Sequence, residues 1–281
     1  MKTWKKIVLG VSLISLFLGG GLVAWGYSQG GLTDLQNKTI SEQDYVKKEV
    51  KDFNKIDIKS SSYNVLIKNG DVDKATLSYY QKTKNPIDTS VKDGQLTIND
   101  SNSELDSTSN KHINFFGLKD LVRLSTLNEE VRNKTIVITL PKKQTIDFLK
   151  VDLATGNLDL SNSTIKQADI NLNVGDLTFT KMIVSNLKSN LDVGSVDSNH
   201  TLFTNSDLSI AMGDYSGENL IFNGHNKLDI TSGDIELALK DYTLNVQADS
   251  HSGEVDITNN LKISKDNTLT ITSDLGDITV E

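Results

Sequence analysis

The second half of the chain repeats a short pattern centred on a glycine. The glycines stand at Gly156, Gly175, Gly194, Gly213, Gly233, Gly253 and Gly276. The intervals between them are 19, 19, 19, 20, 20 and 23 residues. A near-constant period in this range is typical of a stacked repeat, in which each unit contacts only its neighbours.

Apolar residues recur at fixed offsets from these glycines. The residue two positions after each glycine is apolar or aromatic throughout: Leu158, Leu177, Val196, Tyr215, Ile235, Val255 and Ile278. Three other offsets (five before, three before and four after) are mostly apolar, with Ser189, Ser198, Gly217, Ser250 and Ser273 as the exceptions. Because side chains alternate between the two faces of a strand, these offsets assign one side of every repeat to the interior.

The pattern predicts an all-β fold: a single-stranded β-solenoid, or β-helix, with coils of about 20 residues. Each coil would contain two or three short strands, and each strand would pair with its equivalent in the next coil. The glycine would turn the chain at a corner, and the polar residue after it would bond to nearby backbone N–H groups. In the stretch ITSGDIELAL, Ile230, Ile235 and Leu237 would point inward and Gly233 would turn the corner.

The N-terminus predicts a membrane anchor. Three lysines in residues 1–6 precede an uncharged, largely apolar run at 7–27, which is long enough to cross a bilayer as a helix. The lysines favour a cytoplasmic position for 1–6. We expect 28–52 to be a linker, with one or two helical turns near 41–50, and 53–281 to be the solenoid domain. The alternative, a cleaved signal peptide, is less favoured because the apolar run is long and lacks a cleavage site.

The charge of the chain limits its partners. The net charge is −8, and because residues 1–31 carry three lysines and no acids, the remainder carries −11. Such a domain lacks the basic surface of a nucleic-acid binder. The chain has no cysteine, which excludes disulfides and thiolate metal sites.

An insertion at about 101–133 interrupts the strand pattern. It contains an apolar group consisting of Phe115, Phe116, Leu118 and Val122. One hypothesis is an exposed amphipathic element that contacts a membrane or a partner. The favoured interpretation is a helix or loop that covers an open end of the solenoid, because repeat proteins need covered ends.

Motifs for catalysis are absent from the sequence: no phosphate-binding loop, nucleophile elbow or zinc-protease motif occurs. The best metal candidates are four acids that follow corner glycines: Asp214, Asp234, Glu254 and Asp277. The repeat lacks the glycine-rich nonapeptide of calcium-binding solenoids, so corner hydrogen bonding is the favoured role. We expect no cofactor, no metal and no catalytic residue.

Residues from about 53 to 281 resemble the bacterial putative-adhesin family, a β-strand-repeat domain of unknown function. The resemblance lies in FNKIDIKSSSYNVLIKNGD, in KTIVITLPKKQTIDFLKVDLATGNLDLSNS, and in the phrase Ser-Gly-Asp-Ile at 232–235. Members often follow one membrane span and are similar to proteins linked to cell-envelope stress. The resemblance therefore implies a surface or envelope role.

Together these features predict a single-pass protein of the cell membrane with an extracytoplasmic β-solenoid. It would act as an adhesin-like interaction module or a cell-envelope-stress module. Its partner would be a wall polymer, a membrane protein or another copy of the chain. One alternative is the ectodomain of a sensor or regulator that acts on a membrane partner. A second, less favoured alternative is a polysaccharide-active β-helix enzyme, because the only arginines, Arg123 and Arg132, lie in the insertion.

Overall fold

The computed structural model describes residues 43–82, 86–100, 134–258 and 260–281, which belong to one compact unit, Gln43–Glu281. Every regular element in this part of the chain is a β-strand, as the sequence predicts. No helix among these residues is long and apolar enough to cross a membrane. The expected anchor at 7–27 and the expected apolar patch at Phe115, Phe116, Leu118 and Val122 lie outside the described residues.

Each coil of the domain has three sides. A coil begins on the first face with a strand such as β9 (Phe148–Leu153) and turns at Gly156. The second face follows, with β10 (Leu158–Ser161), and after another turn the short β11 (Thr164–Ile165) forms the third face. The chain then starts the next coil with β12 (Ala168–Val174).

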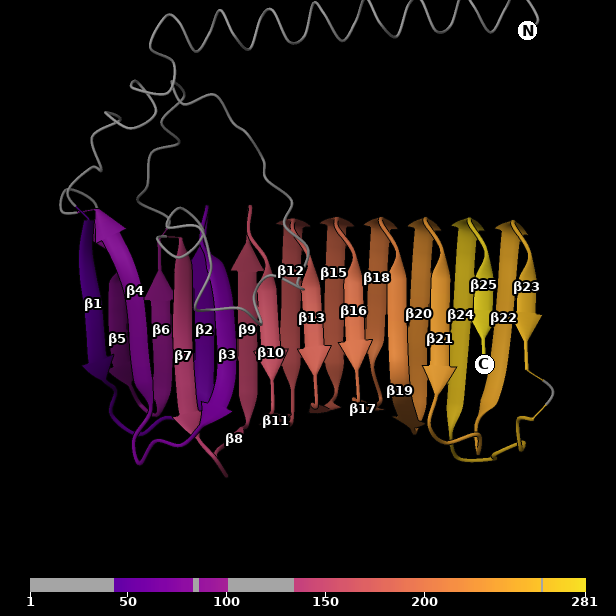
Figure 1. Cartoon of the computed structure of the whole chain (residues 1–281), viewed down its shortest axis with the longest axis horizontal. Coiled ribbons are helices and arrows are strands. Elements are labelled where there is room, and N and C mark those ends of the chain that lie inside the picture. The colour runs from indigo at the N-terminus through magenta and orange to yellow at the C-terminus, as the bar shows by residue number, and fades with distance from the viewer. Residues whose placement is uncertain (1–42, 83–85, 101–133, 259) are drawn as a thin grey trace, which may run out of the picture. The chain divides into compact units, whose positions relative to one another are not determined.

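Equivalent strands of successive coils pair in parallel. Leu158 pairs with Leu177, and Leu177 pairs with Val196, so the register follows the glycine period. The remaining strands of the central coils are β13 (Leu177–Thr180), β14 (Ile183–Ser185), β15 (Leu187–Val193), β16 (Val196–Asn199), β17 (Leu202–Thr204), β18 (Asp207–Met212), β19 (Tyr215–Asn223), β20 (His225–Ser232) and β21 (Ile235–Leu239). Figure 1 shows them side by side along a β-solenoid-like stack.

The stacking order at the C-terminal end differs from the chain order that the sequence suggests. The four strands there are β22 (Asn245–Ser252), β23 (Val255–Ile257), β24 (Thr268–Leu275) and β25 (Ile278–Val280). β24 lies between β20 and β22, and β25 lies between β21 and β23. The last coil in sequence is therefore the second-to-last coil in space. The same apolar columns fit either order, which is why the glycine spacing alone does not reveal it.

The N-terminal end is rearranged in the same way. β2 (Lys55–Ser60) and β3 (Asn64–Gly70) pair directly with β9 and β10, although the chain from 71 to 147 separates them. The outer side of this coil is occupied by β6 (Gln95–Asn99) and β7 (Thr135–Pro141), which pair in parallel with β2 and β3. The chain therefore begins its solenoid inside the stack, where the first coil has a neighbour on each side.

Antiparallel strands cover this outer coil. β5 (Asp88–Lys92) pairs with β6, β4 (Thr76–Lys82) pairs with β7, and β1 (Gln43–Glu49) pairs with β4. The short β8 (Thr145–Ile146) begins the third face.

β1 lies in the segment that we expected to be a linker with helical turns near 41–50, so the helical prediction is wrong there. Its pairing with β4, with the Tyr45 and Tyr80 rings 4.8 Å apart, is a contact that local pattern does not reveal.

The core consists mainly of the predicted inward columns, and Leu158, Leu177, Val196, Ile235 and Ile278 are all fully buried. Val255 was also predicted to point inward, but it is 38% exposed, because among the described strands β23 pairs only with β25 and lies at the end of the stack. Two of the exceptions in these columns, Ser198 and Gly217, have a local reason. Tyr215 turns its ring inward and donates a hydrogen bond to Ser198 Oγ at 2.9 Å. A Cβ on Gly217 would lie 2.4 Å from the Leu220 side chain and 3.1 Å from the Tyr215 ring. Ser198 and Gly217 thus leave space for the larger side chains beside them, Tyr215 and Leu220.

Candidate interaction surface

The seven sequence-predicted glycines all lie at the corner between the first and second faces. Six of them have φ between +139° and +150°, a conformation that L side chains rarely adopt. A Cβ on any of these six would also stand within 1.9–2.4 Å of a carbonyl oxygen in the neighbouring coil. Gly253 has no such φ, but its Cβ would lie 2.0 Å from the Gly276 oxygen. These residues are needed for stacking and carry no side chain for chemistry.

The polar residues after the glycines form a continuous ladder of hydrogen bonds. In each case a side-chain oxygen accepts from the backbone N–H of the equivalent residue in the adjoining coil. The acceptor–donor pairs are Asn64–Asn157, Asn157–Asp176, Asp176–Ser195, Ser195–Asp214, Asp214–Asp234, Asp234–Asp277 and Asp277–Glu254, at 2.8–3.3 Å. The bonds run between coils rather than within a corner.

This ladder accounts for the acids that were the best metal candidates. Asp214, Asp234 and Asp277 each use one carboxylate oxygen to accept a backbone N–H, and Glu254 supplies the last N–H of the series. Within the described ranges, no group of three or more His, Asp or Glu side chains has an arrangement suited to a metal ion. The arrangement favours a structural role for the corner acids.

Two further corners were not identified from the sequence. The corner between the second and third faces carries residues with positive φ at Asn162, Lys181, His200 and Asn219. The corner that returns to the first face carries Asn186, Asn205 and Gly224. Asparagine tolerates the left-handed conformation better than most residues, so the recurring asparagines were the available signal. At the corner between the second and third faces, Lys181 and His200 interrupt the series of asparagines.

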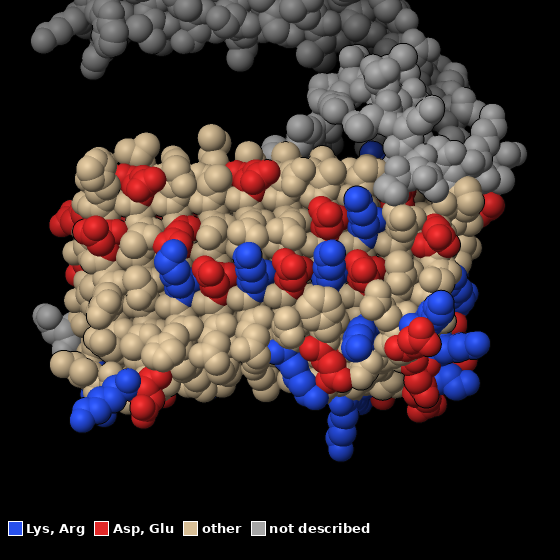
Figure 2. All heavy atoms as spheres, turned by 180° about the vertical axis from the view of Figure 1, so that it is seen from behind, with Lys and Arg blue, Asp and Glu red and all other residues tan. Residues whose placement is uncertain are grey.

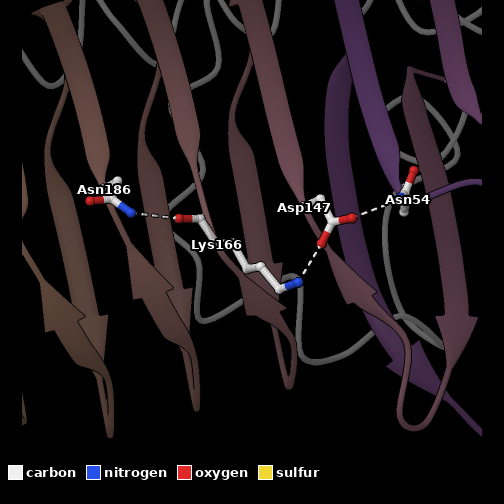
Figure 3. Close-up of polar contacts among 4 residues, drawn as sticks. All are labelled: Asn54, Asp147, Lys166 and Asn186. Carbon is white, nitrogen blue, oxygen red and sulfur yellow. Dashed lines mark hydrogen bonds and ion pairs between the residues drawn. The ribbon is translucent and has the colours of Figure 1, made fainter.

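The corner that returns to the first face is also tied by polar side chains. Figure 3 shows Asp147 between Lys166 and Asn54, which belong to its two neighbouring coils. Lys166 Nζ lies 2.7 Å from Asp147 Oδ1, and Asn186 Nδ2 donates to the Lys166 carbonyl at 3.0 Å. The Lys166 ammonium lowers the pKa of Asp147. All four residues link neighbouring coils.

The first face presents its outward side chains to solvent in straight rows. One row, here called the charge row, alternates in sign across six adjacent strands: Asp57, Lys150, Asp169, Lys188, Asp207 and Lys227. In Figure 2, acidic and basic side chains alternate across the molecule in this way. Neighbouring strands are about 4.8 Å apart, so the charges have a fixed spacing. This row was not predicted, although the 19-residue period places its central members.

A second row lies two residues further along the same strands. Its members are Lys59, Asp152, Asn171, Asn190, Ser209 and Asp229. Asn190 Nδ2 donates to Asn171 Oδ1 at 2.9 Å, which extends the coil-to-coil ties to the surface. Asp229 bonds Lys227 and Thr272, and the bond to Asp229 raises the pKa of Lys227.

The second face carries one buried carboxyl that the alternation assigned to solvent. Asp159 on β10 is only 5% exposed, beside Thr178 on the next strand. Neither of its carboxyl oxygens has a hydrogen-bond partner in the part of the chain that the structure describes. Burial, followed by the charge of Asp176, raises the pKa of Asp159 to about 7.

Comparisons with known proteins identify a family for this chain. The family description Toastrack DUF4097 matches residues 53–281. No curated protein matches the chain in sequence. One similar solved structure is a putative cell adhesion protein from Clostridium sporogenes ATCC 15579, with 17% identity, a TM-score of 0.39, and coverage of 85% of this chain and 99% of that chain. A second is a putative adhesin from Bacteroides fragilis NCTC 9343, with 16% identity, a TM-score of 0.38, and coverage of 85% of this chain and 97% of that chain. A third is a putative lipid binding protein from Parabacteroides distasonis ATCC 8503, with 11% identity, a TM-score of 0.40, and coverage of 85% of this chain and 97% of that chain.

The family match begins at Phe53, just before β2, and continues through the last strand. It therefore includes every coil, the corner glycines and the hydrogen-bond ladder. The chain belongs to the Toastrack DUF4097 family, and putative adhesins are among the solved structures similar to it.

Proposed function

We propose that this protein is a membrane-anchored, extracytoplasmic interaction module of the adhesin-like kind, and that its first face contacts the partner. The observation that carries the proposal is the ten-stranded sheet of the first face. It holds ionised and amide side chains at a regular spacing on a stacked scaffold. Such a surface is flat, whereas small-molecule sites are concave and mostly apolar.

The chemistry of the face favours a macromolecule over a small substrate. Lys150, Lys188 and Asp207 have no side-chain hydrogen bond or ion pair within the described residues, so their charges are available to a partner. Because acids and bases alternate, a uniformly charged polymer would meet repulsion at every second position. The face therefore suits a partner with both charge signs, such as another protein surface.

The location is proposed from the N-terminal sequence. The apolar run 7–27 with its preceding lysines supports a single uncleaved span and an exported C-terminal domain. The proposal that the protein is not an enzyme is supported by the roles of its corner acids, which are engaged in hydrogen bonds between coils.

The location can be tested with single cysteines, because the chain has none of its own. We expect a Glu236→Cys variant, exposed on the second face, to react with a membrane-impermeant maleimide in intact cells. A Lys5→Cys variant should react only after permeabilisation. Labelling of Lys5→Cys alone in intact cells, or loss of an N-terminal tag by cleavage, would contradict the proposed topology.

The interaction role can be tested by crosslinking in intact cells. A photocrosslinking amino acid at position 188 on the first face should capture a specific partner, and the same group at 236 on the second face should not. Capture of the same products from both positions, or none from 188, would contradict a function of the first face.

Replacement of 7–27 by an unrelated span separates the adhesin-like role from the regulator role. If the adhesin-like proposal is correct, crosslinking from 188 survives the replacement, because the first face alone recognises the partner. A regulator that acts through its span would lose the crosslink.

A further inference from the structure

We propose that two copies of this chain associate through their first faces, related by a two-fold axis that runs parallel to the strands between β12 and β15. This inference rests on the proposed function of the first face and names its partner as a second copy. It follows from the order of charges on that face and from the position of those charges in the sheet.

The charge row is complementary to itself under this rotation. A two-fold axis that lies in the plane between two facing sheets, parallel to the strands, reverses the order of strands and keeps each row in place. Asp169 then faces Lys188 of the other copy, Lys150 faces Asp207, and Asp57 faces Lys227. All six charges meet the opposite sign, because an alternating row with an even number of members inverts its signs when reversed. A two-fold axis along the stack would instead place each charge opposite itself.

The second row fits the same operation. Lys59 faces Asp229, Asp152 faces Ser209, and Asn171 faces Asn190. An amide both donates and accepts hydrogen bonds, so the central asparagine pair is compatible with a symmetric contact. Two independent rows thus share one axis.

The axis also coincides with the middle of the sheet. The first face has the order β22-β24-β20-β18-β15-β12-β9-β2-β6-β5, so five strands lie on each side of the axis. Complete overlap gives a contact of about 43 by 20 Å, or about 900 Å² per copy, from the usual strand spacing and rise. This is close to the roughly 800 Å² per partner of a standard stable interface.

The contact is least favourable at the two ends of the sheet. In the charge row the outermost residues are neutral: Ser90 faces Gln247, and Thr97 faces Thr270. In the second row Asp88 faces Asp249, a like-charge pair. This mismatch gives the proposal a specific consequence, because Asp249→Lys would convert the repulsion into attraction.

The alternative explanation is that alternation only neutralises each row within one molecule. Each charge in the row has an opposite charge on the adjacent strand, which lowers repulsion without any partner. The two explanations make different predictions for mixtures of two variants, because mixing changes the contacts between copies and leaves the contacts within each copy the same.

The test uses the full-length chain in detergent micelles and measures energy transfer between copies. The donor or acceptor dye is attached to the single cysteine of a Glu236→Cys background. Asp169→Lys places the new lysine opposite the native Lys188 of the other copy, and Lys188→Asp places the new aspartate opposite the native Asp169. Each like-charge contact occurs twice in the dimer, so we expect each variant alone to associate at least about tenfold more weakly than the parent chain at low salt.

An equimolar mixture of the two variants should recover most of the association. The lysine introduced at position 169 of one copy then faces the aspartate introduced at position 188 of the other. The second central contact pairs the native Lys188 with the native Asp169, so both contacts again join opposite charges.

Three results would overturn the inference. The first is a parent chain that stays monomeric at about 100 μM in low salt. That concentration is well above the dissociation constants expected for an interface of this size. The second is single variants that associate as the parent does, and the third is a mixture that associates no better than either variant alone. Circular dichroism and melting of each variant show whether it is folded. Lys181→Asp, at an exposed corner, controls for a charge reversal away from the face.

Asp249→Lys provides an independent test with the opposite sign. It should strengthen association by several-fold, and added Asp88→Lys should cancel the gain, because it makes the end pair like-charged again. A gain that persists in the double variant would contradict the axis. If the dimer fails these tests while position 188 still crosslinks to another molecule in cells, the self-association inference falls and the proposed interaction function remains.

Discussion

The carbonyl oxygen of Gly156 occupies the space that a side chain on Gly175 would need: a Cβ at residue 175 would lie 2.1 Å from it. The same contact recurs at each successive corner, where the neighbour is backbone and has no rotamer by which to move. The closeness of the corners is what allows each polar side chain after a glycine to reach the N–H of the next coil.

We expect Gly175→Ala to be among the most damaging single substitutions in the chain. It combines the backbone clash with a φ of +150°, so the free energy of unfolding should fall by about 3 kcal/mol or more. Thermal and denaturant unfolding measure it. The matched control is Gly94→Asn, at a hairpin turn with φ +72° and a nearest contact of 3.3 Å to the Asn54 side chain. Because asparagine tolerates this left-handed region, the control should cost less than about 1 kcal/mol. Equal losses would show that the corner contact is not the cause.

Asp159 should make stability depend on pH. Its pKa of about 7 in the folded protein lies above the ordinary 3.8, so the folded state binds the proton more tightly than the unfolded state. The contribution is most favourable below about pH 4 and is lost as the pH rises towards 7, by about 4 kcal/mol in total.

Asp159→Asn removes this dependence. We expect the variant to melt above the parent chain at pH 8 and close to it at pH 4. Asp256→Asn, exposed on the same face, controls for the loss of one negative charge. A difference between Asp159→Asn and the parent that is independent of pH would show that the carboxyl is not the titrating group.

The hydrogen bond between Tyr215 and Ser198 should contribute more to the free energy of unfolding than an exposed hydrogen bond of the same length, because both groups are buried. Tyr215→Phe leaves the Ser198 hydroxyl without its phenolic partner, and we expect a loss of about 1–3 kcal/mol in unfolding free energy. Adding Ser198→Ala should recover part of it, since the unsatisfied hydroxyl is then removed. Additive losses in this double-mutant cycle would contradict the coupling.

Ile235 tests the inward columns. It is 0% exposed, between Tyr215 and Ile278 on the neighbouring strands. Ile235→Asp buries an unpaired charge, and we expect the domain to lose several kcal/mol or to fail to fold. The neighbouring Glu236 points to solvent, so Glu236→Gln should change the unfolding free energy by less than about 0.5 kcal/mol. An unchanged melting curve for Ile235→Asp would mean that the column is assigned wrongly.

The central coils were predictable from sequence because their information is local and repeated. Leu158, Leu177 and Val196 share one offset from a glycine, and the register of a parallel stack must keep that offset. The corner glycines followed from the same period. The corner between the second and third faces was missed because Lys181 and His200 interrupt its asparagines, Asn162 and Asn219.

The candidate surface was only partly accessible to the same reasoning. Asp169, Lys188 and Asp207 stand 19 residues apart, and their alternation was present in the repeat. Asp57 joins the row only because β2 pairs with β9, a contact between distant parts of the chain. The burial of Asp159 likewise depends on tertiary surroundings and leaves no trace in the local pattern.

The sequence by itself determined that this chain is a stack of coils, which side of each strand faces the core, and where the coils turn at glycine. Period-two alternation and a nearly constant repeat length are sufficient for those conclusions, because every coil places apolar residues inward at the same offsets from a corner glycine. Only the tertiary structure decided the order of coils at the two ends, the addition of β1, and the complete charge row. Equivalent apolar columns can stack in more than one order, so the choice depends on which distant strands become neighbours.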